Sequence, residues 1–414
     1  MLSALKLIQE MKKRPEHPLW VASQQILVRG LMALKFLIAA RLLGPEQIGL
    51  VGIALLSLAI VEAMTDTGLS QAVIQHRKRI DKDEAGAAWT LQVCRGVVLG
   101  ALLIASATPI ALFFETAASA QLIAISATIP VLRNAINPGL FITQRERNFR
   151  KISFYESSAA FLDFLASLIL IKLGFGVTSI LIGSIASETL KLILSWSWLK
   201  IETTPNTQWK KIRDLTNFGK WVWGSSIITL ILNQLDKVLV VKFLGTNQFG
   251  LYQVASRIAQ LLISDGVTAL GQFLFPTFSE IFRTSYSEAR KYFRKVIIAV
   301  SATIAILSIL ISLLAKNILS LTLGVEWLSA APILQILSIG MFFGACIAIL
   351  VSFSRAIGKP QLVTQAVFVQ LITLCITAPI LITSLESVGM ALASCSAMLS
   401  TVIFLTVKIS KMKI

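Results

Sequence analysis

Ionisable side chains are scarce in this sequence. Only 14% of its 414 residues are Asp, Glu, Lys or Arg, and 55% are hydrophobic, whereas an ordinary soluble domain has about 25% charged residues. There are two histidines, and none of the four cysteines has metal-type spacing. These shortages exclude a soluble enzyme and argue against histidine-based metal sites or general bases. We therefore expect no catalytic residues, no metal and no cofactor.

Long apolar segments fill most of the chain, whose mean hydropathy is +0.77. A bilayer core about 30 Å thick needs about 20 apolar residues per helical crossing. Twelve such segments can be placed, at 22–43, 49–73, 87–113, 119–143, 155–173, 177–199, 218–243, 249–275, 295–315, 328–352, 361–383 and 387–408. The sequence thus predicts an all-α integral membrane protein with 12 transmembrane helices and no room for a soluble catalytic domain.

Lys and Arg are concentrated in alternate turns between these segments. The opposite set of turns holds only Arg41, Lys172, Lys242 and Lys316. Because basic residues accumulate on the cytoplasmic side, we expect both termini in the cytoplasm and no cleaved signal peptide, since the basic N-terminal twenty residues lack an apolar core. The net charge of +17 then reflects topology and not a nucleic-acid-binding surface.

One motif occurs twice. Residues 40–54 read ARLLGPEQIGLVGIA and residues 241–255 read VKFLGTNQFGLYQVA, with six of fifteen positions identical at an offset of 201. Each copy lies at the turn between the first two helices of its half. Gly44 and Gly245 are expected to take the left-handed conformation that ends a helix, and Pro45 suits the first turn of the next helix.

The repeat predicts the architecture. Six helices per half is an even number, so both halves enter the membrane from the same side. Parallel repeats of this kind are related by an axis along the membrane normal, with the binding site at their interface. We expect two pseudo-symmetric six-helix lobes, at 1–210 and 211–414, around a central cavity, and one chain is sufficient as a monomer.

These motifs resemble those of a known family. The first repeat, followed by Asp66–Leu69, is similar to the N-terminal motif of the polysaccharide transporter family, within the multidrug/oligosaccharidyl-lipid/polysaccharide exporter superfamily. Asp236 and Lys237, the run FLGTNQFGLYQVASRIAQ and the later Phe273–Pro276 resemble the corresponding pattern of the second half.

The resemblance implies an oligosaccharide flippase and not an enzyme. Such proteins move undecaprenyl-pyrophosphate-linked sugar repeat units from the cytoplasmic to the outer leaflet of the bacterial inner membrane, for O-antigen, capsule or exopolysaccharide synthesis. The implied partners are the lipid-linked oligosaccharide and membrane lipids, with a polysaccharide polymerase and glycosyltransferases acting alongside. The glycan is not identified by the resemblance.

Several basic residues lie within the predicted spans, where each charge costs about 2.5 to 3.5 kcal/mol at the bilayer centre. They are Arg29, Lys35, Arg95, Arg133, Lys191, Lys237 and Arg257. Lys191 is expected to pair with Glu188 on the same helical face. The other six predict a pyrophosphate site, because guanidinium groups bind phosphate oxygens bidentately. The alternative is a set of structural ion pairs with buried carboxylates.

The intramembrane acids offer a second function. Glu62 and Asp66 are four residues apart and share one helical face, so together they are candidates for a proton or sodium site. They are equally expected to neutralise Arg29 or Lys35. Export could also be driven by the membrane potential, which supplies about 2.3 kcal/mol per charge per 100 mV to an outward-moving anion.

Two other functions have to be weighed. A multidrug exporter of the same superfamily would share the fold and the repeats, but a pump for cationic drugs needs a cavity rich in carboxylates. A membrane-embedded glycosyl- or acyltransferase would need a convergent set of His, Asp or Glu at one interface, and here the acids are scattered over several helices.

Overall fold

The computed structural model describes residues 14–65, 82–199, 201–203, 205 and 209–411, and nearly all of them are helical. A helix satisfies its own backbone hydrogen bonds, which an apolar chain in lipid requires. The elements are α2 (Pro18–Met64), α4 (Lys82–Phe113), α5 (Ala117–Ser126), α6 (Thr128–Asn134), α7 (Gly139–Arg145), α8 (Phe149–Lys172), α9 (Thr178–Ser197), α10 (Trp209–Ala259), the π-turn η1 (Gln260–Ser264), α11 (Asp265–Thr284), α12 (Tyr286–Thr322), the 3-10 turn η2 (Val325–Ala330), α13 (Ala331–Ala356) and α14 (Pro360–Ser410).

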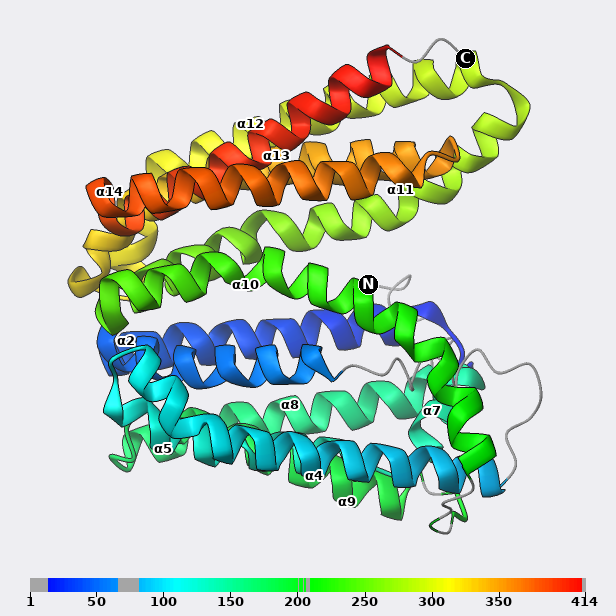
Figure 1. The fold of residues 1–414 in the computed structure, drawn as a ribbon, viewed down its shortest axis with the longest axis vertical. Coiled ribbons are helices and arrows are strands. Elements are labelled where there is room, and N and C mark those ends of the chain that lie inside the picture. The colour runs from blue at the N-terminus through cyan, green and yellow to red at the C-terminus, as the bar shows by residue number, and fades with distance from the viewer. Residues whose placement is uncertain (1–13, 66–81, 200, 204, 206–208, 412–414) are drawn as a thin grey trace, which may run out of the picture. The chain divides into compact units, whose positions relative to one another are not determined.

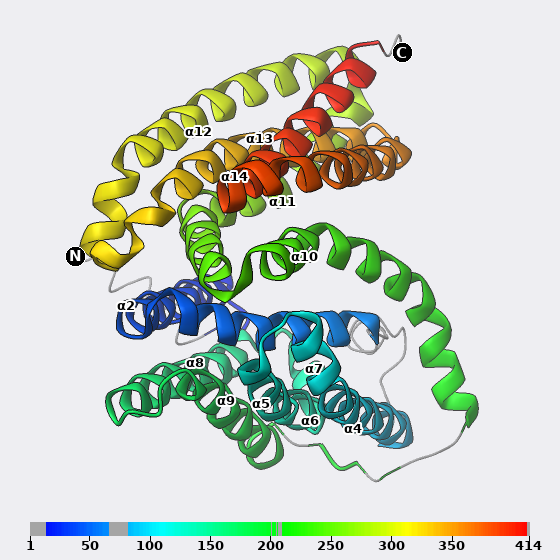
Figure 2. The same ribbon diagram turned by 60° about the vertical axis from the view of Figure 1, so that its left-hand side comes forward.

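The helices form two compact units. One contains Met1–Leu43 and Leu50–Gln234, and the other contains Gly44–Gly49 and Leu235–Ile414. In the first unit α8 packs on α9, and α4 packs on α5 and α6, which in turn contact α9 (Figure 1). In the second unit α13 contacts α11, α12 and α14 (Figure 2).

Seven of the described helices are long and apolar enough to cross a membrane, or up to eight when the bent pair α5–α6 and α7 is counted as one span. Two of the seven, α2 and α14, contain a backbone break, at Gly44 and Glu386. Helix α10 has a break of the same kind at Gly245. Each break falls at or beside a turn predicted between two spans. The total of twelve crossings stays a prediction.

The breaks in α2 and α10 depend on glycine. Gly44 has φ 79° and ψ 171°, and Gly245 has φ 76° and ψ −175°. The predicted positive φ is confirmed, although ψ near 180° puts both residues outside the left-handed helical region. This extended, positive-φ region is essentially restricted to glycine, which explains why both copies of the repeat carry glycine at this position.

The break in α14 falls on a residue with a side chain. Glu386 has φ 51° and ψ −135°, a conformation that costs a non-glycine residue about 1 to 3 kcal/mol. The repeat residue Gln248 holds this turn. Its Nε2 donates to Glu386 Oε2 at 2.8 Å, and its Oε1 accepts from Ser387 Oγ at 2.9 Å.

The two copies of the repeat meet within the second unit. A Cβ atom at Gly49 would collide with the main-chain oxygen of Thr246, and one at Gly250 would collide with that of Pro45. Pro45 and Thr246 are equivalent positions of the repeat, as are Gly49 and Gly250, so the two contacts are related by a local twofold. Small residues let helix backbones approach closely in membranes, and here both glycines have that role.

The segment 119–143, predicted as one span, is interrupted. Helices α5, α6 and α7 replace it, and the chain bends by 59° between α6 and α7. Pro138 lies at the bend. It has no N–H to donate and disfavours helical geometry in the residue before it, so the bend has a cause readable in the sequence. That 119–143 crosses the membrane once stays a prediction.

Side chains satisfy the backbone groups that this bend releases. The carbonyl of Ala135 accepts from Nε1 of Trp89 at 3.2 Å and from Nε1 of Trp196 at 3.0 Å. The side-chain oxygen of Asn137 accepts from the backbone N–H of Gly139 at 2.8 Å. Non-helical backbone at membrane depth is tolerated where protein surrounds it in this way.

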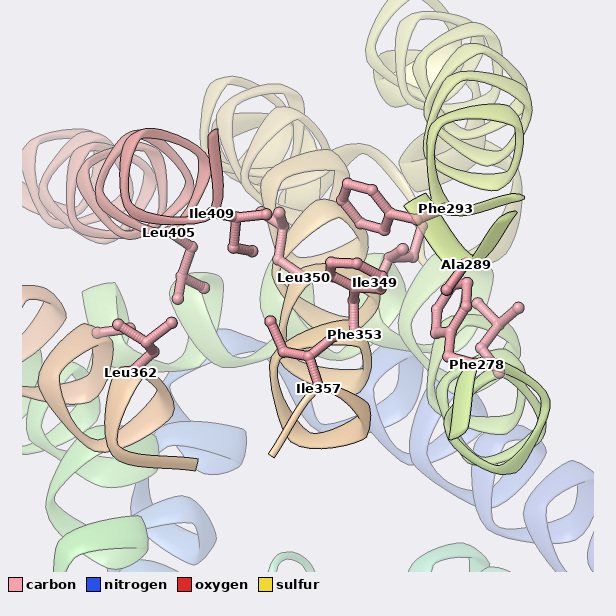
Figure 3. Packing of buried hydrophobic residues seen from close by; sticks show 12 residues of the cluster. Phe278, Ala289, Phe293, Ile349, Leu350, Phe353, Ile357, Leu362, Leu405 and Ile409 are labelled. Atoms are coloured by element: carbon pink, nitrogen blue, oxygen red, sulfur yellow. The ribbon is translucent and has the colours of Figure 1, made fainter. Parts of the chain in front are cut away.

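Aromatic rings join three helices of the second unit (Figure 3). Phe293 of α12 stacks on Phe353 of α13 with centroids 4.3 Å apart, and Phe278 of α11 meets Phe353 edge-to-face at 5.5 Å. Leu405 and Ile409 of α14 belong to the same buried cluster. Tight packing of this kind holds helices together where lipid is as apolar as the side chains.

The close contact between the two copies of the repeat predicts which glycine can be replaced by alanine. Gly49→Ala should lower the thermal unfolding midpoint in detergent, because overpacking costs about 1 to 3 kcal/mol. Gly30→Ala is the matched control on the same helix, since nothing lies within 4 Å of its Cβ position. It should leave the midpoint unchanged or raise it. Equal midpoints for the two variants would disprove the close approach at Gly49.

Candidate functional site

Arg133 bridges two carboxylates in the first unit. From α6, its Nη1 donates to Glu62 Oε1 at 2.8 Å, and its Nε and Nη2 donate to Glu188 Oε1 at 3.0 and 2.9 Å. The side chain of Arg133 is 46% exposed, that of Glu62 26% and that of Glu188 9%. One guanidinium thus binds acids from α2 and α9 and still presents much of its surface.

Arg95 lies beside this triad. From α4, its Nη2 donates to the main-chain oxygen of Glu62 at 3.1 Å, and its Nε is 3.4 Å from Thr65 Oγ1. Glu62 therefore contacts two of the four predicted site arginines, Arg133 through its side chain and Arg95 through its backbone. The structure thus brings Arg95 and Arg133 together at Glu62, and their role in binding a pyrophosphate stays a prediction.

Lys35 has a different environment. Its Nζ lies 2.7 Å from Asp163 Oδ2 of α8, and the two side chains are 13% and 9% exposed. Ser167 donates a hydrogen bond to the other oxygen of Asp163. This is a buried, satisfied ion pair of the kind that the alternative interpretation predicted.

The ion pairs correct two expected pairings. Lys191 pairs with Glu156 of α8 at 2.9 Å, and not with Glu188, which Arg133 binds. Glu62 pairs with Arg133, and not with Arg29 or Lys35. In each case a partner on another helix has replaced the neighbour expected from sequence spacing.

The remaining predicted site residues within the described ranges lie on α2 and α10. Arg29 is exposed on α2, and its Nε donates to Gln25 Oε1 at 3.1 Å. Lys237 and Arg257 are both partly buried on α10. Asp66 lies outside the described residues, so the proposed pairing of Glu62 with Asp66 stays a prediction.

Asp236, next to Lys237, is bound within the second unit. Its Oδ2 accepts from the hydroxyl of Tyr252 at 2.9 Å, and its Oδ1 accepts from the backbone N–H of Lys237 at 2.8 Å. The Tyr252 hydroxyl also lies 3.4 Å from Ser394 Oγ of α14. This chain of hydrogen bonds joins the two helical parts of α10 to α14.

Sequence reasoning missed the roles of Glu188 and Asp163. Both are acids with at most 9% of the side chain exposed, and both balance a predicted site cation from another helix. Their burial at mid-span was a readable signal, because an acid inside an apolar helix needs a cation. Which cation each one binds was not readable.

The guanidinium of Arg133 keeps N–H donors that its carboxylate partners do not use. A guanidinium has five N–H donors in a planar fork, and the described carboxylates take three of those on Arg133. The described residues include no group of three or more His, Cys, Asp or Glu that would hold a metal ion. The guanidinium can therefore bind a ligand reversibly through charge and hydrogen bonds.

Sequence comparison identifies a family and a relative. The family model described as "Polysaccharide biosynthesis protein" matches residues 38–332. The succinoglycan biosynthesis transport protein ExoT of Rhizobium meliloti is 26% identical over 318 residues, which cover 75% of this chain and 63% of that protein. The matched region therefore spans less than two thirds of this relative.

Two solved transporters have the same fold. An inward-facing multidrug resistance MATE family transporter of the MOP superfamily is similar with a TM-score of 0.73 and 16% identity, over 93% of this chain and 94% of that one. The lipid II flippase MurJ, in an inward closed conformation, is similar with a TM-score of 0.72 and 15% identity, over 95% and 87%. At these identities the likeness establishes the fold alone.

The buried pair of Lys35 and Asp163 predicts a stability effect. Lys35→Met should lower the thermal unfolding midpoint in detergent, because removing one partner of a buried pair costs about 3 to 5 kcal/mol. Combining Lys35→Met with Asp163→Asn should recover most of the loss. Lys172→Met, at an exposed lysine of α8, is the control. If Lys35→Met is as stable as this control, the pair has no structural role.

Proposed function

The chain belongs to the polysaccharide biosynthesis protein family, and on that premise we propose that it is a flippase for a lipid-linked oligosaccharide. The cargo is an undecaprenyl-pyrophosphate-linked repeat unit, carried from the cytoplasmic to the outer leaflet of a bacterial inner membrane for surface polysaccharide synthesis. The transport function in the name of ExoT and the flippase function of MurJ, which has the same fold, support this proposal.

The exposed guanidinium of Arg133 is the observation that carries the proposal. It lies on α6, between apolar segments, and keeps 46% of its side chain exposed despite two carboxylate partners. A cation in such a place needs a watery surrounding or a ligand. The pyrophosphate of a lipid carrier is such a ligand, because phosphate oxygens accept the paired N–H groups of arginine.

The binding set that we propose comprises six cations. They are Arg29, Lys35, Arg95, Arg133, Lys237 and Arg257. Arg133 and Arg95 are central because they meet at Glu62, and Lys35 contributes least because its ion pair with Asp163 is buried. Glu62 and Asp66 are the candidates for a coupling ion.

The mechanism follows from the chemistry of the cargo. The polyprenyl tail stays in the bilayer while only the charged headgroup passes through the protein. We assign the passage to alternating access between two six-helix lobes, 1–210 and 211–414, in a monomer with both termini in the cytoplasm. A polymerase and glycosyltransferases would act on either side of this step.

The fold does not separate a flippase from a multidrug exporter, since the MATE transporter and MurJ are almost equally similar. Charge favours the flippase. An exporter of cationic drugs would present carboxylates to its substrate, whereas Glu62 and Glu188 are both bound to Arg133 here.

Substitution of the central arginines tests the proposed function. Arg133→Ala and Arg95→Ala should each slow flipping of a fluorescent undecaprenyl-pyrophosphate-linked sugar in proteoliposomes by about tenfold or more, because hydrogen bonds to a charged group are worth about 1.5 to 3 kcal/mol. Arg290→Ala, at an exposed arginine of α12, is the control at matched reconstitution. Wild-type rates in both arginine variants would contradict the proposal.

The orientation has its own test. In a variant with the four native cysteines replaced by alanine, Lys316→Cys should react with a membrane-impermeant maleimide in intact spheroplasts, because its turn belongs to the set with few basic residues. Arg150→Cys should react only after permeabilisation. Both side chains are exposed, so accessibility within the protein does not limit either reaction. The reverse labelling pattern would invert the topology.

A further inference from the structure

The two carboxylates on Arg133 bear on the selectivity of the proposed site. Glu62 and Glu188 lie on different helices, α2 and α9, and both direct an oxygen at the guanidinium of α6 at 2.8 to 3.0 Å. Carboxylate and phosphate oxygens make the same kind of hydrogen bond to arginine. Three of the five donors that a phosphate could use on Arg133 are therefore already occupied by anions of the protein itself.

The geometry points to Glu62 and Glu188 as carboxylates that compete with phosphate for the N–H donors of Arg133. They keep small soluble phosphates from binding there, and they are displaced by the pyrophosphate of a lipid-linked cargo. This inference rests on the proposed function. It assigns the two acids as specificity-determining residues, and not as ligands of the cargo.

Competition lowers the affinity of every anion for Arg133. When a binding-competent state is only partly populated, the apparent affinity falls in proportion to that population. A free phosphate can displace the acids only through the hydrogen bonds that its own oxygens accept. A headgroup tethered to a lipid tail is held in the membrane beside the site, and such tethering raises its effective concentration. The internal anions therefore weaken both ligands by the same factor, and only the tethered headgroup is concentrated enough at the site to displace them.

The exposures of the two acids suggest an order of release. Glu62 is 26% exposed and accepts one hydrogen bond from the guanidinium, whereas Glu188 is 9% exposed and accepts two. Displacing Glu62 breaks fewer bonds and leaves that carboxylate closer to water. Glu62 is therefore the acid that yields to the headgroup, while Glu188 keeps the guanidinium in position.

Other charged groups surround the two acids. Arg95 of α4 donates to the backbone of Glu62, and on the α8 and α9 side Lys191 and Glu156 form a separate ion pair at 2.9 Å. The buried phenol of Tyr155 on α8 lies close enough to interact electrostatically with Glu188. Glu156 has the same 26% exposure as Glu62 but binds a lysine outside the triad, which makes it a matched control.

Binding by the purified full-length protein in detergent tests the inference, with inorganic pyrophosphate, undecaprenyl pyrophosphate and undecaprenol as probes. Glu62→Gln keeps the size of the side chain and removes its charge. It should bind inorganic pyrophosphate about tenfold more tightly than wild type, with a similar gain for undecaprenyl pyrophosphate and none for undecaprenol. Glu156→Gln should match wild type with all three probes.

The outcomes separate this inference from the proposed function. If Arg133→Ala weakens undecaprenyl pyrophosphate binding but Glu62→Gln does not tighten inorganic pyrophosphate binding, the competition is disproved and the flippase proposal stands. If Arg133→Ala leaves undecaprenyl pyrophosphate binding unchanged, both fail. Glu188→Gln should tighten binding too; if it fails to fold, Glu62→Gln, whose acid is more exposed, still decides the question.

Discussion

The ionic contact between Arg133, Glu62 and Glu188 determines how the first unit is built. A lone charge among apolar helices is costly, so the cation must be met by acids from other helices, and these come from α2 and α9. The contact ties α6 to both helices. The bend between α6 and α7 has a separate cause in Pro138, and the backbone groups that it releases are satisfied by tryptophan and asparagine side chains.

In the second unit, close contacts between helix backbones hold the helices together. The twin glycines of the repeat allow the chain at Pro45 to contact Gly250 while Gly49 contacts Thr246. Without a hydrophobic force between helices in lipid, such close contacts and interhelical hydrogen bonds supply the attraction. The hydrogen bonds from Gln248 to the turn at Glu386 belong to the same contact region. The shared glycine at 49 and 250 is thus one identity of the repeat that the close contact explains.

The sequence predicted those features of the fold that depend on residues close together in the chain. Glycine at 44 and 245 predicted a positive φ, and the length of the apolar segments predicted helices. The structure has both features. The bend at Pro138 was equally readable and was overlooked. The break at Glu386 had no such signal, because a charged residue is not expected in that conformation. The ion pairs could not be predicted, since Arg133 meets acids 71 and 55 residues away and sequence spacing relates only neighbours on one helix.

The basic residues within the apolar helices therefore differ in exposure, and the sequence alone does not show which are buried with an acid and which stay exposed. Lys35 is buried with its acid, whereas Arg133 keeps an open surface beside its two acids. A structure of the protein with bound undecaprenyl pyrophosphate tests the central claim most directly. We expect a phosphate oxygen about 2.7 to 2.9 Å from a guanidinium nitrogen of Arg133, with Glu62 displaced from it. A headgroup bound elsewhere, with both carboxylates still on Arg133, would contradict the account.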